Sequence, residues 1–122
     1  MIKVSKINWL SEEAKEAEVC LFDGKFSIIT FSHPFKHSIG HIIDLPLFTL
    51  NAKEIYSLNN IETFSVEREG DTFEHKFSGR VINKESNQIL VGEFIIQIDV
   101  SLPNDINIGD YVSFICDRID LY

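Results

Sequence analysis

Hydrophobic and polar residues alternate with a period of two along much of the chain. The clearest stretch is 72–82, where one set of alternate residues is apolar except for a histidine and the other set is polar. The first set is Phe73, His75, Phe77, Gly79 and Val81, and the second is Thr72, Glu74, Lys76, Ser78 and Arg80. Because successive side chains of a strand point to opposite faces of a sheet, this pattern predicts a half-buried antiparallel strand.

The alternation returns over 88–100 and predicts a second strand. Its expected inward residues are Leu90, Phe94, Ile96, Ile98 and Val100, and its outward residues are Glu93, Gln97 and Asp99. The polar segment 83–87 between these strands predicts the turn of a long hairpin. Residues 61–68 precede the turn-forming run 69–71 and so extend the expected meander at its start.

Two further segments carry strand signals. Asp23-Gly24 lies between the apolar runs 17–22 and 25–31, and this dipeptide favours the positive φ angles of a tight hairpin turn. In the last segment, Val112, Phe114 and Cys116 share one face, whereas Ile119 and Leu121 fall on the other. This change of phase predicts a bulge near Asp117.

Helix signals are few. Asn51 and Glu54 have the spacing at which an N-cap side chain and a following glutamate satisfy each other's backbone donors, which predicts one short helix over 52–58. Ser11, ahead of 12–15, predicts a capped turn.

The C-terminal half has the strand-and-turn rhythm of a small barrel. It is carried by Gly79-Arg80-Val81, Val91-Gly92, 96–99, Leu102-Pro103 and 108–114. Over 72–122 this rhythm resembles that of OB-fold and related β-barrels, and the resemblance implies a fold but no functional residue. We therefore predict a single domain over 1–122, mainly β, built as a small antiparallel OB-like barrel of six or seven strands with an added N-terminal hairpin.

Charge narrows the classes of partner. The 122 residues contain 11 Lys and Arg against 19 Asp and Glu, giving a net charge of −8, and most of the excess lies in 11–18 and 99–122. Such a field repels polyanions, so we expect no nucleic-acid partner. No segment has the length and apolar character of a secretory signal or a membrane span, so we expect a soluble cytoplasmic protein with no membrane partner.

One window has metal-ligand residue types. His33, His37 and His41 recur at a spacing of four, and Asp44 follows. Pro34 and Gly40 confine any helix there to about one turn, and in an extended strand this spacing holds neighbouring imidazoles roughly 13 Å apart, too far for one ion. We therefore predict no metal and no cofactor, and an irregular loop with exposed polar side chains. These four residues remain the candidates should a site exist.

The remaining chemistry-bearing residues favour structural roles. His75 lies among phenylalanines, where a neutral, hydrogen-bonded core histidine is expected rather than a catalytic base. Cys20 and Cys116, the two cysteines, stand in apolar runs and are predicted to be core residues; the sequence leaves open whether they form a disulfide. We predict no catalytic residue, because no nucleophile has an evident base and the six glycines are dispersed singly rather than in a phosphate-binding loop.

These observations favour a non-catalytic protein-interaction module that docks a basic protein partner through its barrel rim or acidic segments, by charge-steered association. Two alternatives stay open. One is a metal-dependent or small-molecule enzyme that uses His33, His37, His41 and Asp44. The other is single-stranded nucleic-acid binding by analogy with OB folds, for which the mixed outward charges of 72–82 are unsuited.

Overall fold

The computed structural model describes residues 1–122 and is mainly β, as predicted. Its twelve strands form one open mixed sheet. The strands are β1 (Ile2–Ser11), β2 (Glu16–Phe22), β3 (Ser27–Ser32), β4 (Ile42–Ile43), β5 (Leu47–Leu50), β6 (Lys53–Ser57), β7 (Ser65–Arg68), β8 (His75–Asn83), β9 (Gln88–Val91), β10 (Phe94–Gln97), β11 (Tyr111–Cys116) and β12 (Arg118–Asp120). Hydrogen-bonded neighbours follow the order β4-β1-β2-β3-β12-β5-β10-β9-β8-β11-β6, and β7 pairs with β8 beside this path.

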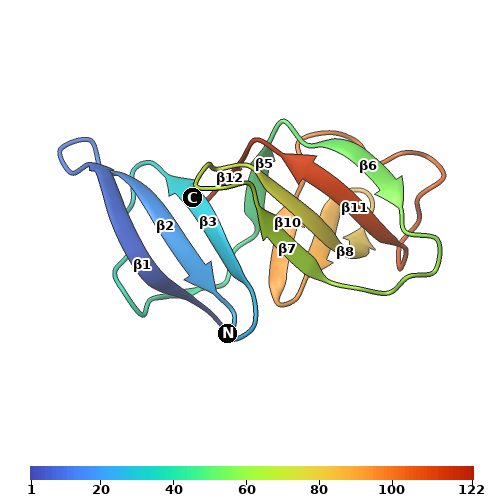
Figure 1. Ribbon diagram of the computed structural model, residues 1–122, viewed down its shortest axis with the longest axis horizontal. Coiled ribbons are helices and arrows are strands. Elements are labelled where there is room, and N and C mark those ends of the chain that lie inside the picture. Colours follow the sequence, from blue (N-terminus) through green and yellow to red (C-terminus); the bar gives the residue numbers. More distant parts are fainter.

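The first three strands form an antiparallel meander on one side of the molecule (Figure 1). The hairpin predicted at Asp23-Gly24 is confirmed, since β2 and β3 pair on either side of it. The Asp23 carboxylate accepts hydrogen bonds from the backbone N–H groups of Lys25 and Phe26 within the turn and of Glu93 in a distant turn. Burial raises the pKa of Asp23, but the N–H donors of Glu93, Phe26 and Lys25 outweigh it and hold the pKa below its usual range.

The predicted strand at 72–82 is confirmed as β8, in which Phe77 and Val81 are fully buried and Lys76 and Arg80 are exposed. The predicted pairing of 61–68 with it is confirmed for β7. The single strand predicted over 88–100 is wrong, because the chain turns at Gly92, whose φ is +60°, and makes the hairpin β9–β10. This turn reverses the faces of β9, so Ile89 and Val91 are buried, and Val100 beyond β10 is exposed.

The predicted change of phase near Asp117 is confirmed, but it is an exchange of partners between two strands rather than a simple bulge. β11 pairs with β8 and β6, whereas β12, after Asp117, pairs with β5 and in parallel with β3. The exchange lets Cys116 and Ile119 both be buried. Because β12 lies between β3 and β5, it joins the N-terminal meander to the remaining strands (Figure 1).

The helix predicted over 52–58 is wrong, and the segment forms the edge strand β6. Asn51 has φ of +57° and its side chain donates to Asp117, so it does not cap a helix. Glu54, the other half of the expected capping box, also has a positive φ, at a register shift between β6 and β11. The turn predicted after Ser11 is present, with the Ala14 N–H donating to Ser11 Oγ.

The predicted closed OB-like barrel of six or seven strands is also wrong. The sheet is open, contains twelve strands and ends at β4 and β6, which do not pair with each other. Alternation of side chains reports which face of a strand is buried, but not which strands are neighbours. The resemblance to OB folds therefore does not extend to their closure or to their helix.

One cluster of 23 buried apolar residues forms the core and draws on β1, β2 and β3 as well as on β8–β12. Phe77 and Phe114 pack at its centre, with ring centroids 5.3 Å apart. Gly79 lets β8 and β9 approach closely, since a Cβ atom there would clash with the Leu90 carbonyl oxygen. The structure contains no helix with the length and apolar character needed to cross a membrane.

Candidate functional site

The histidine-rich window forms a loop over 33–41 that runs beside β1. Its first part is fixed where the Phe35 N–H donates to the Lys15 carbonyl oxygen, at 2.8 Å. Its last part is fixed by two hydrogen bonds to Val4, whose carbonyl accepts from the Gly40 N–H and whose N–H donates to the His41 carbonyl. Phe35 is buried and its ring packs edge-on against Trp9 of β1, with centroids 5.8 Å apart. The loop is therefore irregular, as predicted, but anchored at both ends.

The structure brings two of the four candidate metal ligands together. The rings of His37 and His41 have centroids 4.3 Å apart, because the chain turns back where the His41 N–H donates to the Ser38 carbonyl. Burial, followed by the positive charge of His41, lowers the pKa of His37. His33 and Asp44 are exposed; His33 lines one depression with His37, but its ring is not in contact with the pair. Nowhere in the chain do three or more His, Cys, Asp or Glu side chains gather in a way that could hold a metal ion.

His75 is a buried structural residue, which confirms the sequence interpretation. Its Nε2 accepts a hydrogen bond from the Ile29 N–H at 3.3 Å, so Nδ1 carries the proton and donates to the Phe73 carbonyl at 2.9 Å. The ring stacks on Phe77 and links β8 to β3. Burial lowers the pKa of His75, the hydrogen bond to Phe73 opposes this, and the charge of Arg68 adds to it. Both ring nitrogens are thus occupied by backbone groups.

Cys116 lies opposite His75 in the pairing of β11 with β8, an arrangement that resembles a nucleophile beside a base. Burial raises the pKa of the Cys116 thiol to about 12, so the thiol stays protonated near neutral pH. With both nitrogens of His75 engaged, this pair lacks an active base and an ionised nucleophile. Cys20 is half-buried, and both cysteines are free thiols.

Most acidic residues of 99–122 make hydrogen bonds or ion pairs with other groups of the chain. The Asp99 carboxylate accepts from the Thr49 hydroxyl and from the N–H groups of Asn51 and Ala52, at 2.7–2.8 Å. Burial raises the pKa of Asp99, but these donors outweigh it and lower the pKa overall. Asp117 accepts from Asn51 and pairs with Lys53, and Asp120 pairs with Arg118. These carboxylates therefore fasten β5, β6 and β12, although Asp99 and Asp117 remain exposed.

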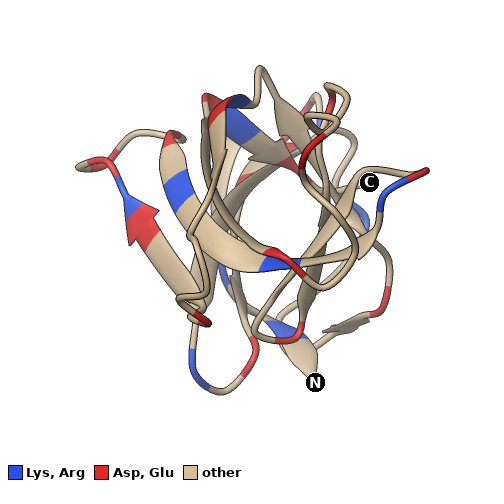
Figure 2. Ribbon diagram, turned by 90° about the vertical axis from the view of Figure 1, so that its right-hand side faces the viewer, with Lys and Arg blue, Asp and Glu red and all other residues tan.

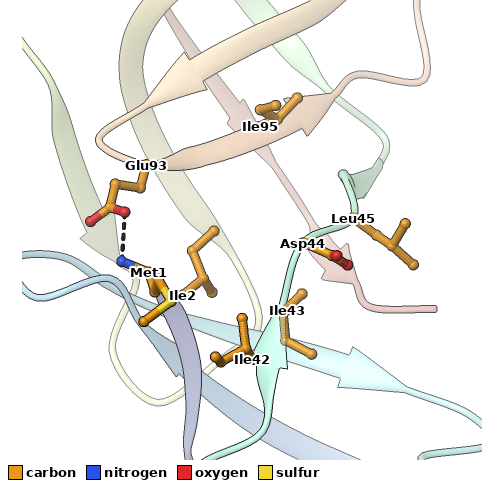
Figure 3. Close-up of a pocket in the computed structure, with 8 residues that line it drawn as sticks. All are labelled: Met1, Ile2, Ile42, Ile43, Asp44, Leu45, Glu93 and Ile95. Atoms are coloured by element: carbon orange, nitrogen blue, oxygen red, sulfur yellow. Dashed lines mark hydrogen bonds and ion pairs between the residues drawn. The ribbon is translucent and has the colours of Figure 1, made fainter.

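A groove that the sequence analysis missed lies beside β4, the strand at one end of the sheet (Figure 3). We call it the β4 groove; its volume is about 330 Å³ and its lining residues are Met1, Ile2, Ile42, Ile43, Asp44, Leu45, Glu93 and Ile95. Residues of β1 and β4 lie on one side and Ile95 of β10 lies on the other (Figure 3). The N-terminal amine pairs with Glu93 at one end of the groove, 2.7 Å away. Asp44, at the other end, takes part in none of the four ion pairs of the chain.

The groove exposes large apolar side chains. Met1 is 70%, Leu45 60% and Ile42 47% exposed, and Ile39 nearby in the sequence is 60% exposed. The segment 39–47 is rich in apolar residues without a period of two or of 3.6, and this irregular run is the signal by which the sequence could have indicated a partly exposed apolar surface.

Charged residues elsewhere are interspersed. Figure 2 shows Lys and Arg interspersed with Asp and Glu over the ribbon, with no continuous basic track in this view.

No protein-family model, curated protein sequence or solved structure matches this chain.

Proposed function

We propose that this chain is a non-catalytic module that binds a basic protein partner, and that it does so through the β4 groove. The observation that carries the proposal is the exposure of Met1, Ile42 and Leu45 around one depression. Each Å² of apolar surface that a partner covers contributes roughly 25 cal/mol, so burying these side chains favours association. Exposed apolar patches of this kind mark interaction sites on protein surfaces.

The occupant that suits the groove is a short extended segment with aliphatic side chains and a Lys or Arg. The volume of about 330 Å³ lies at the small end of ligand pockets and accommodates a few side chains. The unpaired Asp44 carboxylate offers a basic residue an ion pair at the rim, and the net charge of −8 attracts a basic protein over a longer range. This assignment moves the expected docking surface from the acidic segments to the groove.

The proposal is tested with a display library of random peptides panned against the purified protein. We expect the enriched peptides to combine aliphatic residues with Lys or Arg, and to bind more weakly as salt is added. Leu45→Asp should lower the affinity of such a peptide about tenfold or more, because it places a charge in the apolar contact. Ile108→Asp is the matched control, since Ile108, at 67%, is about as exposed as Leu45, at 60%, but does not line the groove.

Peptides that bind wild type and Leu45→Asp equally, or a library without any binder that depends on the groove, would overturn the proposal. Isotope-labelled protein adds a direct readout, because the peptide should shift the methyl signals of Ile42, Leu45 and Ile95.

The same proposal places the protein in the cytoplasm, where a reducing environment keeps thiols such as Cys20 and Cys116 unpaired. The two other functions considered from the sequence gain no specific support. An enzyme built on His33, His37, His41 and Asp44 would need all four side chains at one place, and a nucleic-acid site would need a basic groove.

A further inference from the structure

We propose that His37 and His41 form a two-imidazole binding site for a divalent transition-metal ion, with Cu²⁺ bound most tightly. The proposal is separate from the β4 groove, because neither histidine lines it. It starts from the contact between the two rings, whose centroids are 4.3 Å apart with an angle of 41° between the ring planes. Imidazole nitrogens are common ligands of Cu²⁺, Ni²⁺ and Zn²⁺.

The loop holds the two histidines in place before any ion binds. The backbone of His41 is fixed by hydrogen bonds to Val4 and Ser38, at 2.9 and 3.0 Å. The ring of His37 packs against the buried ring of Phe35, with centroids 5.7 Å apart. A preorganised pair gives up little conformational freedom when it binds an ion, which favours affinity.

The ring nitrogens are also free to bind. Neither imidazole makes a hydrogen bond or an ion pair within the chain, in contrast to His75, whose two nitrogens are both occupied. His41 is exposed and His37 half-buried, so water can complete the coordination of an ion held by two nitrogens. For such a nitrogen site the order of affinity is Zn²⁺ and Ni²⁺ below Cu²⁺.

The single tryptophan of the chain lies close enough to report on this site. Trp9 contacts Phe35, and Phe35 contacts His37, so the indole is two ring contacts away from the pair. Cu²⁺ is paramagnetic and quenches nearby indole fluorescence, whereas Zn²⁺ does not. Binding at this pair can therefore be followed without any assay of activity.

The test uses the untagged full chain titrated with CuCl₂ near neutral pH, followed by Trp9 fluorescence and calorimetry. The double variant H37N/H41N gives the background from all other groups. We expect wild type to bind about one equivalent of Cu²⁺ above this background, and each single variant to lose about tenfold or more in affinity. Electron paramagnetic resonance of the wild-type complex should show coupling to two imidazole nitrogens.

The matched control is His33→Asn, which removes an exposed histidine that lines one depression with His37 but whose ring contacts neither ring of the pair. It should leave affinity and quenching unchanged. Equal loss in His33→Asn would overturn the two-histidine assignment, and so would equal Cu²⁺ binding by wild type and H37N/H41N. Leu45→Asp should bind Cu²⁺ like wild type, so failure of the groove proposal and failure of this one are distinguishable. Circular dichroism of each variant verifies that the strands are retained.

Discussion

Two polar regions of the molecule use the same residue types in opposite ways. Around β5, β6 and β8, the side chains of Asp99 and His75 are held by backbone groups and join strands that are far apart in the sequence. In the segment 33–45, the side chains of His37, His41 and Asp44 make no hydrogen bond or ion pair within the chain. The difference teaches that a titratable group near strand ends serves the fold when backbone donors surround it, and is available to a ligand when they do not.

The contrast between these two regions predicts its largest effect on stability at Asp99. Asp99→Ala removes an exposed carboxylate that accepts three hydrogen bonds and should lower the free energy of unfolding by about 2 kcal/mol. The N–H group of the buried Ala52 loses a charged partner, whereas that of the exposed Asn51 can bond to water instead. Urea denaturation measures the loss. Asp105→Ala, which removes an exposed carboxylate of the same acidic segment, should change the free energy by less than about 0.5 kcal/mol. Equal effects of both substitutions would contradict a structural role for Asp99.

The next effect is a dependence of stability on pH that comes from His75. Its pKa in the folded protein lies below the ordinary value of 6.5, so the unfolded chain takes up a proton first as the pH falls. The contribution of His75 to the free energy of unfolding is therefore fully present above pH 6.5. It decreases as the pH falls from 6.5 to the pKa that His75 has in the folded protein. Unfolding should become easier between neutral pH and mildly acidic pH, as urea denaturation at a series of pH values would show.

His75→Gln should flatten this dependence, since glutamine does not titrate, while His33→Gln should leave it intact. If the pH dependence of the free energy of unfolding persists in His75→Gln, titratable groups other than His75 cause it.

A smaller effect is expected at Thr49, the side-chain partner of Asp99. Its hydroxyl donates to the Asp99 carboxylate at 2.7 Å and accepts from the Asp99 N–H at 3.0 Å. Thr49→Val keeps the shape and removes both bonds, which should cost about 1–2 kcal/mol in thermal or urea unfolding. The double variant with Asp99→Ala should lose less than the sum of the two single losses, because the two residues share one interaction. Additive losses would show that they act independently.

The smallest effect on stability is expected in the other region. Asp44→Asn alters an exposed carboxylate with no ion pair, so the free energy of unfolding should stay within about 0.5 kcal/mol of wild type. Binding of a basic peptide selected on the β4 groove should weaken and lose part of its salt dependence, which fluorescence anisotropy at two salt concentrations can measure. A clear loss of stability in Asp44→Asn would show that Asp44, like Asp99, stabilises the fold, and would contradict the contrast between the two regions.

Local patterns in the sequence determined several parts of this structure. Alternation located β8 and its buried face, Asp23-Gly24 located the β2–β3 hairpin, and the change of phase at Asp117 located the boundary between β11 and β12. Each of these features depends on residues that are neighbours in the chain, so the sequence is sufficient to indicate them. The buried, neutral state of His75 also followed from its position among apolar residues on one face.

Only the tertiary structure decided which strands are neighbours, and the functional surfaces follow from that choice. The Asn51 and Glu54 pattern predicts a helix by itself, but contacts with Asp99 and Asp117, which are distant in sequence, hold this segment as a strand. The β4 groove requires Ile95 to lie across from Ile42, and the pairing of His37 with His41 requires a loop anchored to Val4. Such contacts depend on how separate strands meet in space, and a pattern of neighbouring residues carries no information about that.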